Sequence, residues 1–308
     1  MLKYIMKNRY IATILITISL VSSFLYADTN ILIFGDIYPG GRVQTNFLLK
    51  KERMDPRLLS LILRADVVIG NFECTATYEQ TGADKMYLLR LFPDFSSHTE
   101  MFSLDAVTLA NNHILDYGEK GMLDTIEYLK KLNIKITGAG KDINDAMKPA
   151  VLTAKNGSTV RLFGFSDITP SFFADMTTAG TCPADPHTIR IALEPYKNAE
   201  GITIVYFHFG QEYDMQVTER QKKLSRLALE YGADIVVGAH THVVQVWEMI
   251  GGKPVFYGLG NTLFDIDHRL STKTGLVPMI TVKDNGEISA DIFTIRSEPD
   301  SYMPYVFK

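Results

Sequence analysis

The amino-acid sequence predicts an α/β protein with layered strands and helices. Short apolar runs end in glycine or in polar turn residues, and segments with helical periodicity lie between these runs. Apolar runs of this length, bounded by turn signals, are typical of strands buried on both faces. Their alternation with amphipathic helices favours a layered α/β architecture.

The first 27 residues are predicted to be a targeting segment. Three basic residues precede an apolar run from Ile11 to Tyr26, and the small residue Ala27 follows it. This order is typical of the signal peptide of an exported protein. The alternative is an N-terminal membrane anchor, although the run is shorter than the ~20 residues that a comfortable span needs. The sequence therefore predicts location in the periplasm or at the cell surface.

Composition argues against one class of partner. Removal of residues 1–27 takes away three positive charges, so the formal net charge moves from −4 to −7. An acidic chain without long Lys/Arg clusters is not typical of nucleic-acid-binding proteins. No Pro-, Ser- or Gly-rich linker divides residues 28–308, which we expect to form one domain. With only Cys74 and Cys182, the chain predicts no disulfide-stapled fold.

Five strand-like runs end in residues of the types that bind metals. In chain order they are Asn30–Asp36, Ala65–Glu73, Leu104–His113, Ile202–Gly210 and Ala233–His242. Neutral imidazole is the commonest protein ligand of divalent transition metals. Because sites in layered α/β folds gather at the carboxyl ends of strands, we expect these five ends to lie close together.

Helices and a hairpin are predicted between and after these strands. The helix signals are Asp55-Pro56 followed by Leu58, Leu59, Ile62 and Leu63; Gly118 followed by Met122, Ile126 and Leu129; and a Thr218–Gln221 capping box followed by Leu224, Leu227, Ala228 and Tyr231. Gly232 is expected to end the third helix. Asn285-Gly286 predicts a hairpin between two late strands, Leu276–Val282 and Glu287–Ile295.

The strand ends supply a set of candidate metal ligands: Asp36, Glu73, Asn112, His208, His240 and His242. Each residue alone has a structural alternative, because Gly-Asp and paired asparagines form turns and a buried histidine can be a core residue. Their occurrence at five strand ends favours the ligand interpretation. A carboxylate has two oxygens with several lone pairs, so Glu73 is the candidate for a bridge between two ions.

The order and spacing of these motifs resemble the bacterial capsule-synthesis CapA family from about Ile31 to Asp265. The shared motifs are Gly35-Asp36, Asn71-Phe72-Glu73, Asn111-Asn112-His113 through Asp116-Tyr117-Gly118, Gly138-Ala139-Gly140, His208-Phe209-Gly210-Gln211-Glu212-Tyr213, Gly238-Ala239-His240-Thr241-His242 and Tyr257-Gly258-Leu259-Gly260-Asn261. The family is related to poly-γ-glutamate synthesis proteins and resembles calcineurin-like metallophosphoesterases. It implies a layered α-β-β-α metallophosphoesterase-like sandwich over residues 28–308.

The resemblance also implies a metal site with one or two divalent ions, of Mn, Zn or Fe. It assigns Asp36, Glu73 and His242 to a first metal, and Asn112, His208 and His240 to a second metal that shares Glu73. His113 would steady or protonate a leaving group. Asp116 would either orient His113 or cap the helix after Gly118. The Gly258–Asn261 turn is either a backbone cradle for an anion or a tight turn.

One departure leaves two functions open. Ordinary metallophosphoesterases begin with Asp-x-His, whereas Asp36-Ile37-Tyr38 has no such histidine and Glu73 replaces the usual bridging aspartate. The first expectation is an exported metal-dependent hydrolase that acts on a phosphoester or an anionic envelope polymer during capsule or poly-γ-glutamate synthesis or processing. The second is a non-catalytic accessory subunit that binds or guides an anionic surface polymer, with a membrane synthase complex as candidate partner.

Overall fold

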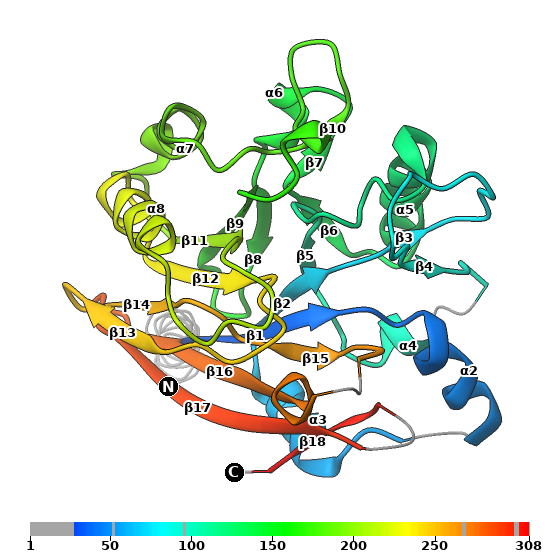
Figure 1. The fold of residues 1–308 in the computed structure, drawn as a ribbon. Coiled ribbons are helices and arrows are strands. Elements are labelled where there is room, and N and C mark those ends of the chain that lie inside the picture. The colour runs from blue at the N-terminus through cyan, green and yellow to red at the C-terminus, as the bar shows by residue number, and fades with distance from the viewer. Residues whose placement is uncertain (1–27, 51–52, 95–96, 267–268, 299–301, 308) are drawn as a thin grey trace, which may run out of the picture.

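The computed structural model shows two β-sheets that lie face to face, with helices on their outer faces (Figure 1). It describes residues 28–50, 53–94, 97–266, 269–298 and 302–307. The predicted targeting segment, residues 1–27, lies outside the described residues, and its division from a single folded domain stays a prediction.

Among the described residues, the first sheet has eight strands in the order β18-β17-β16-β1-β2-β5-β6, with β15 paired to β1. Their bounds are β1 Thr29–Ile37, β2 Val67–Phe72, β5 Ala106–Thr108, β6 Lys135–Thr137, β15 Asn261–Leu263, β16 Thr274–Val282, β17 Ile288–Ser297 and β18 Pro304–Val306. Strands β1, β2, β5 and β6 are parallel, and β16 pairs antiparallel with β1. The predicted hairpin joins β16 to β17, with Gly286 at a φ of 81°.

The second sheet has six strands within the same ranges, in the order β13-β14-β12-β11-β9-β8. Their bounds are β8 Ala150–Thr153, β9 Thr159–Ser166, β11 Ile202–His208, β12 Ile235–Ala239, β13 Trp247–Ile250 and β14 Lys253–Phe256. Strands β9, β11, β12 and β14 are parallel. Two short ladders pair β3 Thr75–Ala76 with β4 Arg90–Leu91, and β7 Ala139–Gly140 with β10 Gly180–Thr181.

The three predicted helices form, as α3, α5 and α8, together with further helices that the sequence analysis did not predict. In chain order the helices are α2 Gly41–Lys50, α3 Pro56–Arg64, α4 Ser97–Glu100, α5 Gly118–Lys131, α6 Ile143–Ala146, α7 Pro186–Leu193 and α8 Glu219–Glu230, with short 3-10 turns η1 Pro170–Phe172, η2 Glu194–Tyr196 and η3 Leu270–Lys273. The Asp55 side chain accepts hydrogen bonds at the start of α3, and Thr218 with Gln221 forms the predicted capping box of α8. Within the part of the chain that the structure describes, none of these helices has the length and apolarity to span a bilayer.

Three apolar layers hold the sandwich together. Between the sheets, Ile33 and Ile69 of the first sheet share a cluster with Leu162 and Ile204 of the second. The outer layers pack α3 and α5 against the first sheet, and α7 and α8 against the second. The predicted α-β-β-α arrangement is therefore present, because both faces of each sheet are covered by apolar contacts.

Two details differ from the sequence prediction. In α3 the buried residues are Leu58, Leu61 and Ile62, whereas Leu59 and Leu63 are 43% and 70% exposed. The apolar residues run almost without interruption through this helix, so periodicity did not single out one stripe. Strand β5 ends at Thr108, so Leu109, Ala110 and the Asn-Asn-His motif lie beyond the strand, and a turn begins at Asn112.

The two cysteines are free and buried in different layers of the sandwich. Cys74 belongs to the layer under α3 and α5, and Cys182 to the layer under α7 and α8. Burial raises the pKa of both thiols well above the ordinary value, so both are protonated at neutral pH.

Candidate metal centre

The six predicted ligands come together at the carboxyl ends of parallel strands from both sheets. Asp36 lies near the end of β1, Glu73 follows β2, Asn112 lies in the turn after β5, His208 ends β11, and His240 and His242 follow β12. All six side chains are buried, and Asn112, the most accessible, is 8% exposed. The loops that follow these strands all begin at the same edge of the sandwich. Residues that lie far apart in sequence therefore meet there.

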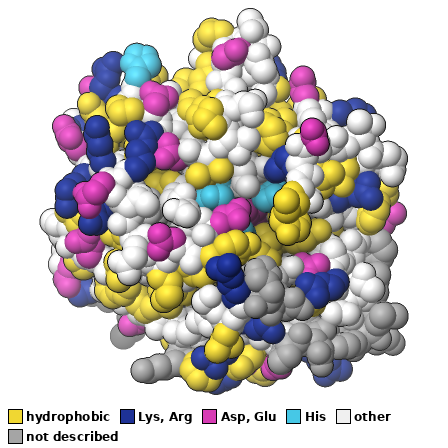
Figure 2. Space-filling view, viewed as in Figure 1, with side chains coloured by type: hydrophobic (Ala, Val, Ile, Leu, Met, Phe, Trp, Pro, Cys, Tyr) yellow, Lys and Arg dark blue, Asp and Glu magenta, His cyan; other side chains and the backbone are white. Residues whose placement is uncertain are grey.

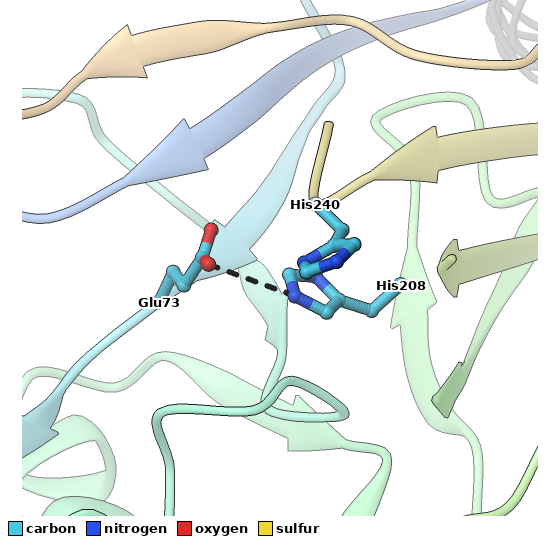
Figure 3. Close-up of side chains that lie close together, drawn as sticks. All are labelled: Glu73, His208 and His240. Atoms are coloured by element: carbon cyan, nitrogen blue, oxygen red, sulfur yellow. Dashed lines mark ion pairs between the residues drawn. The ribbon is translucent and has the colours of Figure 1, made fainter. Parts of the chain in front are cut away.

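The ligand atoms form two groups that share Glu73. One group contains Glu73, His208 and His240, and the other contains Asp36, Glu73 and His242; in each group the ligand atoms lie within 4.8 Å of one another. Glu73 Oε1 is 3.6 Å from His208 Nε2 and 3.8 Å from His242 Nε2. Figure 3 shows Glu73, His208 and His240 pointing toward one another from different elements. Each group could hold one cation, with Glu73 as the bridge.

Two orphaned atoms show that these residues fit a cation. Glu73 Oε1 and His240 Nδ1 are buried and have no hydrogen-bond partner among the described residues. Because most buried polar side-chain atoms have a partner, two orphans at one point indicate that a group bound there supplies it. A divalent cation would accept lone pairs from both atoms.

The charge states of these groups also suit a metal. Burial, and then the charge on neighbouring imidazoles, lowers the pKa of His208 well below its ordinary value and lowers the pKa of His240 to about 3. Both rings are therefore neutral near pH 7, which is the form that binds metals. Burial, and then the negative charge of Asp36, raises the pKa of Glu73 well above its ordinary value. A cation between the two carboxyl groups would relieve this repulsion.

The loops that carry the ligands have strained backbones. His240, His242 and Tyr213 have φ values of 89°, 55° and 65°, in the left-handed region that non-glycine residues rarely adopt. Contacts across the site hold this conformation: the His240 amide donates to Asp36 Oδ2 at 3.3 Å, and the Tyr213 amide donates to the Thr241 carbonyl at 2.8 Å. Such strain is concentrated at functional sites because the surrounding contacts must over-determine it.

Asn112, His113 and Asp116 lie together on one side of the two groups. Asn112 Oδ1 is 2.8 Å from His208 Nε2, and His113 Nδ1 is 2.7 Å from Asp116 Oδ2. Burial lowers the pKa of His113, although Asp116 raises it. The Asp116 carboxylate accepts from His113, Lys85 and the Leu89 amide, a geometry that favours the orienting role over the helix cap. The ligand and proton-donor roles themselves stay predictions.

Sequence reasoning assigned no role to three residues that hold the ligands in place. Asn71 Nδ2 donates to Asp36 Oδ1 at 2.8 Å and lies 3.3 Å from Glu73 Oε2. Asn261 Oδ1 is 2.9 Å from His242 Nδ1. Asn71 and Asn261 both belong to motifs shared with the CapA family, and that membership was the sequence signal that could have identified them. The third residue, Lys85, belongs to no motif.

The Gly258–Asn261 turn packs against β1. A Cβ on Gly35 would lie 2.1 Å from the Gly260 carbonyl oxygen, and the Asp36 amide donates to that oxygen at 3.1 Å. Glycine is required at Gly35 by this close approach. The segment's contribution to the site is Asn261, which contacts His242.

The site opens on the face drawn in Figure 2, where histidine and acidic side chains lie in a hollow beside hydrophobic ones. Tyr213 lies at this site, with its ring centroid 6.1 Å from that of His242, and the Arg269 guanidinium stacks 4.5 Å above the Tyr213 ring. The ligands lie at the base of this hollow. A substrate could reach them if its reacting group is at one end of the molecule and enters the hollow first.

Known proteins resemble the chain in sequence. The family model described as bacterial capsule synthesis protein PGA_cap matches residues 30–266. The PGA biosynthesis protein CapA of Bacillus subtilis (strain 168) is 37% identical over 256 residues, which cover 82% of this chain and 67% of that protein. The capsule biosynthesis protein CapA of Bacillus anthracis is 31% identical over 249 residues, which cover 78% and 60%. The chain thus spans about two thirds or less of the length of these relatives.

A solved structure resembles the chain in fold. It is described as a novel phosphatase from Mycoplasma pneumoniae, with a TM-score of 0.55 and 15% sequence identity, and the match covers 90% of this chain and 96% of that one. At this identity the likeness shows the fold alone. The fold is the layered α-β-β-α sandwich that the family resemblance implied.

Proposed function

The chain belongs to the family of bacterial capsule synthesis proteins, and we propose that it is an exported, metal-dependent hydrolase of the metallophosphoesterase type. Its substrate would be a phosphoester or an anionic envelope polymer during capsule or poly-γ-glutamate synthesis or processing. The observation that carries the proposal is the sharing of Glu73 by two groups of buried ligands. Two adjacent cation sites with a carboxylate bridge are typical of hydrolases that cleave phosphoesters.

The two ligand groups define where the metal ions would bind. Asp36, Glu73 and His242 would hold one ion, and Glu73, His208 and His240 would hold the other, with the Asn112 amide oxygen beside His208. Bound divalent ions supply Lewis-acid chemistry and lower the pKa of water. Imidazole and carboxylate ligands suit Mn, Zn or Fe.

The protein's own residues supply orientation and a proton. Asp116 accepts the His113 Nδ1 hydrogen bond at 2.7 Å, which fixes the ring and leaves Nε2 to act on a leaving group. Asn71 holds the Asp36 and Glu73 carboxylates from behind. Hydrogen bonds of this kind hold metal ligands in a fixed orientation.

Export and polymer partners are part of the same proposal. The pattern of residues 1–27 supports export to the periplasm or cell surface, with cleavage or membrane anchoring as the two modes. The similarity to proteins named for capsule and PGA biosynthesis supports an anionic envelope polymer as substrate or partner, and a membrane synthase complex as a further partner. The acidic net charge argues against nucleic acid.

A non-catalytic accessory role is the second candidate. It is favoured by the first ligand group, where Asp36-Ile37-Tyr38 supplies one ligand in place of the two of Asp-x-His. Ile37 is a core residue and the Tyr38 hydroxyl donates to the Arg90 carbonyl at 3.3 Å, so neither replaces the missing histidine. A protein with a weakened first site could bind an anionic polymer through its metal without cleaving it.

Metal content and hydrolysis, measured on the same purified full-length samples, decide between these functions. We expect about two transition-metal ions per chain from the bridged ligand groups and hydrolysis of a generic phosphodiester. The His240→Ala/His242→Ala variant should lose both, whereas His187→Ala, at an exposed histidine, should lose neither. Metal without hydrolysis of any tested ester would favour the accessory role. Absence of both metal and hydrolysis from a folded wild-type protein would overturn the hydrolase proposal and favour the accessory role.

A further inference from the structure

We propose that Lys85 is a positioning residue for His113 and acts through Asp116, an inference that rests on the proposed hydrolase function. The Lys85 ammonium donates to Asp116 Oδ1 at 2.5 Å and to the Asn112 carbonyl at 2.6 Å. Its Nζ is also 3.4 Å from His113 Nδ1. One cation therefore contacts the peptide of a candidate metal ligand and the carboxylate that orients the candidate proton donor.

Asp116 is a buried carboxylate that depends on its partners. Its side chain is fully buried, and its two oxygens accept from Lys85 Nζ, from His113 Nδ1 and from the Leu89 amide. A buried charge is costly unless it is paired and hydrogen-bonded. Lys85 supplies the full opposite charge, so it keeps the carboxylate where His113 can use it.

The geometry makes the orientation of His113 depend on Lys85. Lys85 Nζ and His113 Nδ1 are both donors, so their 3.4 Å separation is a convergence on Asp116 and not a hydrogen bond between them. With Lys85 on Oδ1, Asp116 Oδ2 is directed to Nδ1. When the ring is in its doubly protonated form, the Nε2 proton passes to the leaving oxygen as the P–O bond breaks, and His113 is left neutral with its remaining proton on Nδ1. Without Lys85, Asp116 Oδ2 keeps the Leu89 amide but Oδ1 loses its charged partner, so the carboxylate holds the His113 ring and its tautomer less firmly.

The segment that carries Lys85 is anchored independently of the ammonium. The Ala83 amide donates to the Asp116 carbonyl at 2.8 Å, and the Leu89 amide donates to Asp116 Oδ2 at 2.7 Å. The Lys85 side chain is 23% exposed and lies 5.4 Å from the centroid of the Phe172 ring. Replacement of Lys85 by methionine keeps most of this apolar contact, so the variant should fold.

The test is the dependence of the loss on the leaving group. A proton donor matters most for a poor leaving group, so Lys85→Met should lower kcat for phenyl phosphate by about 100-fold. For p-nitrophenyl phosphate, whose leaving group needs little protonation, kcat should change by less than about 3-fold. Bound metal should stay at the wild-type level, since Lys85 is not a ligand. A merely structural role would instead lower both rates together.

Three variants serve as controls. In a His113→Ala background, Lys85→Met should cause no further loss, because both changes act on one step. Lys85→Cys treated with 2-bromoethylamine regains an ammonium and should recover hydrolysis of phenyl phosphate, while Cys74 and Cys182 stay buried. Lys120→Met, at an exposed lysine that pairs with Asp124, should behave as wild type.

Two outcomes overturn the inference. Equal losses for both esters, or loss of metal in Lys85→Met, would show a structural role. If the wild-type protein hydrolyses neither ester, the proposed function fails, and imidazole ¹⁵N NMR still tests Lys85. The His113 signal should report a proton on Nδ1 in the wild type and a mixture of tautomers in Lys85→Met; an unchanged signal would contradict the positioning role.

Discussion

At the residue scale, the ligands depend on buried amides beside them. Asn71 Nδ2 contacts Asp36 Oδ1, Glu73 Oε2 and His208 Nδ1 at 2.8, 3.3 and 3.3 Å. Asn71 is itself held by Asn111, whose Nδ2 donates to Asn71 Oδ1 at 3.1 Å. Residues that orient metal ligands contribute to metal affinity because they fix the ligand in its binding geometry.

Replacement of Asn71 by leucine should weaken metal binding. The change keeps a similar volume but removes the donor shared by Asp36 and Glu73, so the two carboxylates lose their fixed orientation. We expect about a 10–100-fold fall in affinity, as is usual for such supporting residues, measured by competition with a chelator. Asn144→Ala, at an exposed residue of α6, should bind metal as the wild type does. Equal affinities for all three proteins would contradict the supporting role.

The sequence could predict the ligands but not their supports. Glu73, His240 and His242 follow apolar strands directly, so residue type and position were enough to select them. Asn71 had no assigned role, and its contact with Asp36 spans 35 positions. Lys85 reaches Asp116 across 31 positions from a loop without a motif. Such contacts depend on how loops fold over the strand ends, which local patterns do not encode.

At the element scale, local signals predicted where helices and strands begin but not always which face is buried. The cap at Asp55, the capping box at Thr218 and the hairpin at Gly286 form as expected. Each of these is a hydrogen-bonding or backbone requirement of a few neighbouring residues. The buried face of α3 depends on contact with the first sheet, and there Leu59 and Leu63 are exposed.

Replacement of Asp55 by alanine should destabilise the protein through α3. The Asp55 carboxylate accepts from the Arg57 and Leu58 amides at 2.7 and 3.3 Å, and loss of such a cap costs about 0.5–2 kcal/mol. Despite partial burial, which raises it, the pKa of Asp55 is lowered by its hydrogen bonds with Arg57. Its charge therefore stabilises the fold above the unfolded pKa of ~3.9, and the effect is lost as pH falls through the lower native value.

Urea unfolding at several pH values measures this effect. The difference between wild type and Asp55→Ala should be largest at neutral pH and should shrink below about pH 4. Asp55→Ser is the matched control, because a hydroxyl keeps the cap without a titrating charge. Its stability relative to Asp55→Ala should not vary with pH in this range. A constant difference between wild type and alanine at all pH values would contradict the charged cap.

At the scale of the whole molecule, the candidate metal centre joins the two sheets. Asp36 and Glu73 come from the first sheet, and His208 and His240 from the second. The Tyr206 hydroxyl already makes one such link, donating to the Phe34 carbonyl at 2.8 Å. Sequence patterns predicted the strands of both sheets, but the family resemblance was needed to place the sheets face to face, because periodicity shows that a strand is buried and not what covers it.

Metal binding should therefore stabilise the whole sandwich. An ion that binds the folded chain and not the unfolded one adds about 2.7 kcal/mol at a free concentration of 100 Kd, because its ligands are assembled only when both sheets are packed. Thermal unfolding of the full chain with Mn²⁺ or Zn²⁺, and after chelation, should show a higher Tm with metal. Glu73→Gln should abolish most of this shift, because both ligand groups share Glu73. The exposed-histidine variant His187→Ala should keep the shift. If neither metal changes the Tm of the wild-type protein, the prediction that metal binding stabilises the fold is wrong.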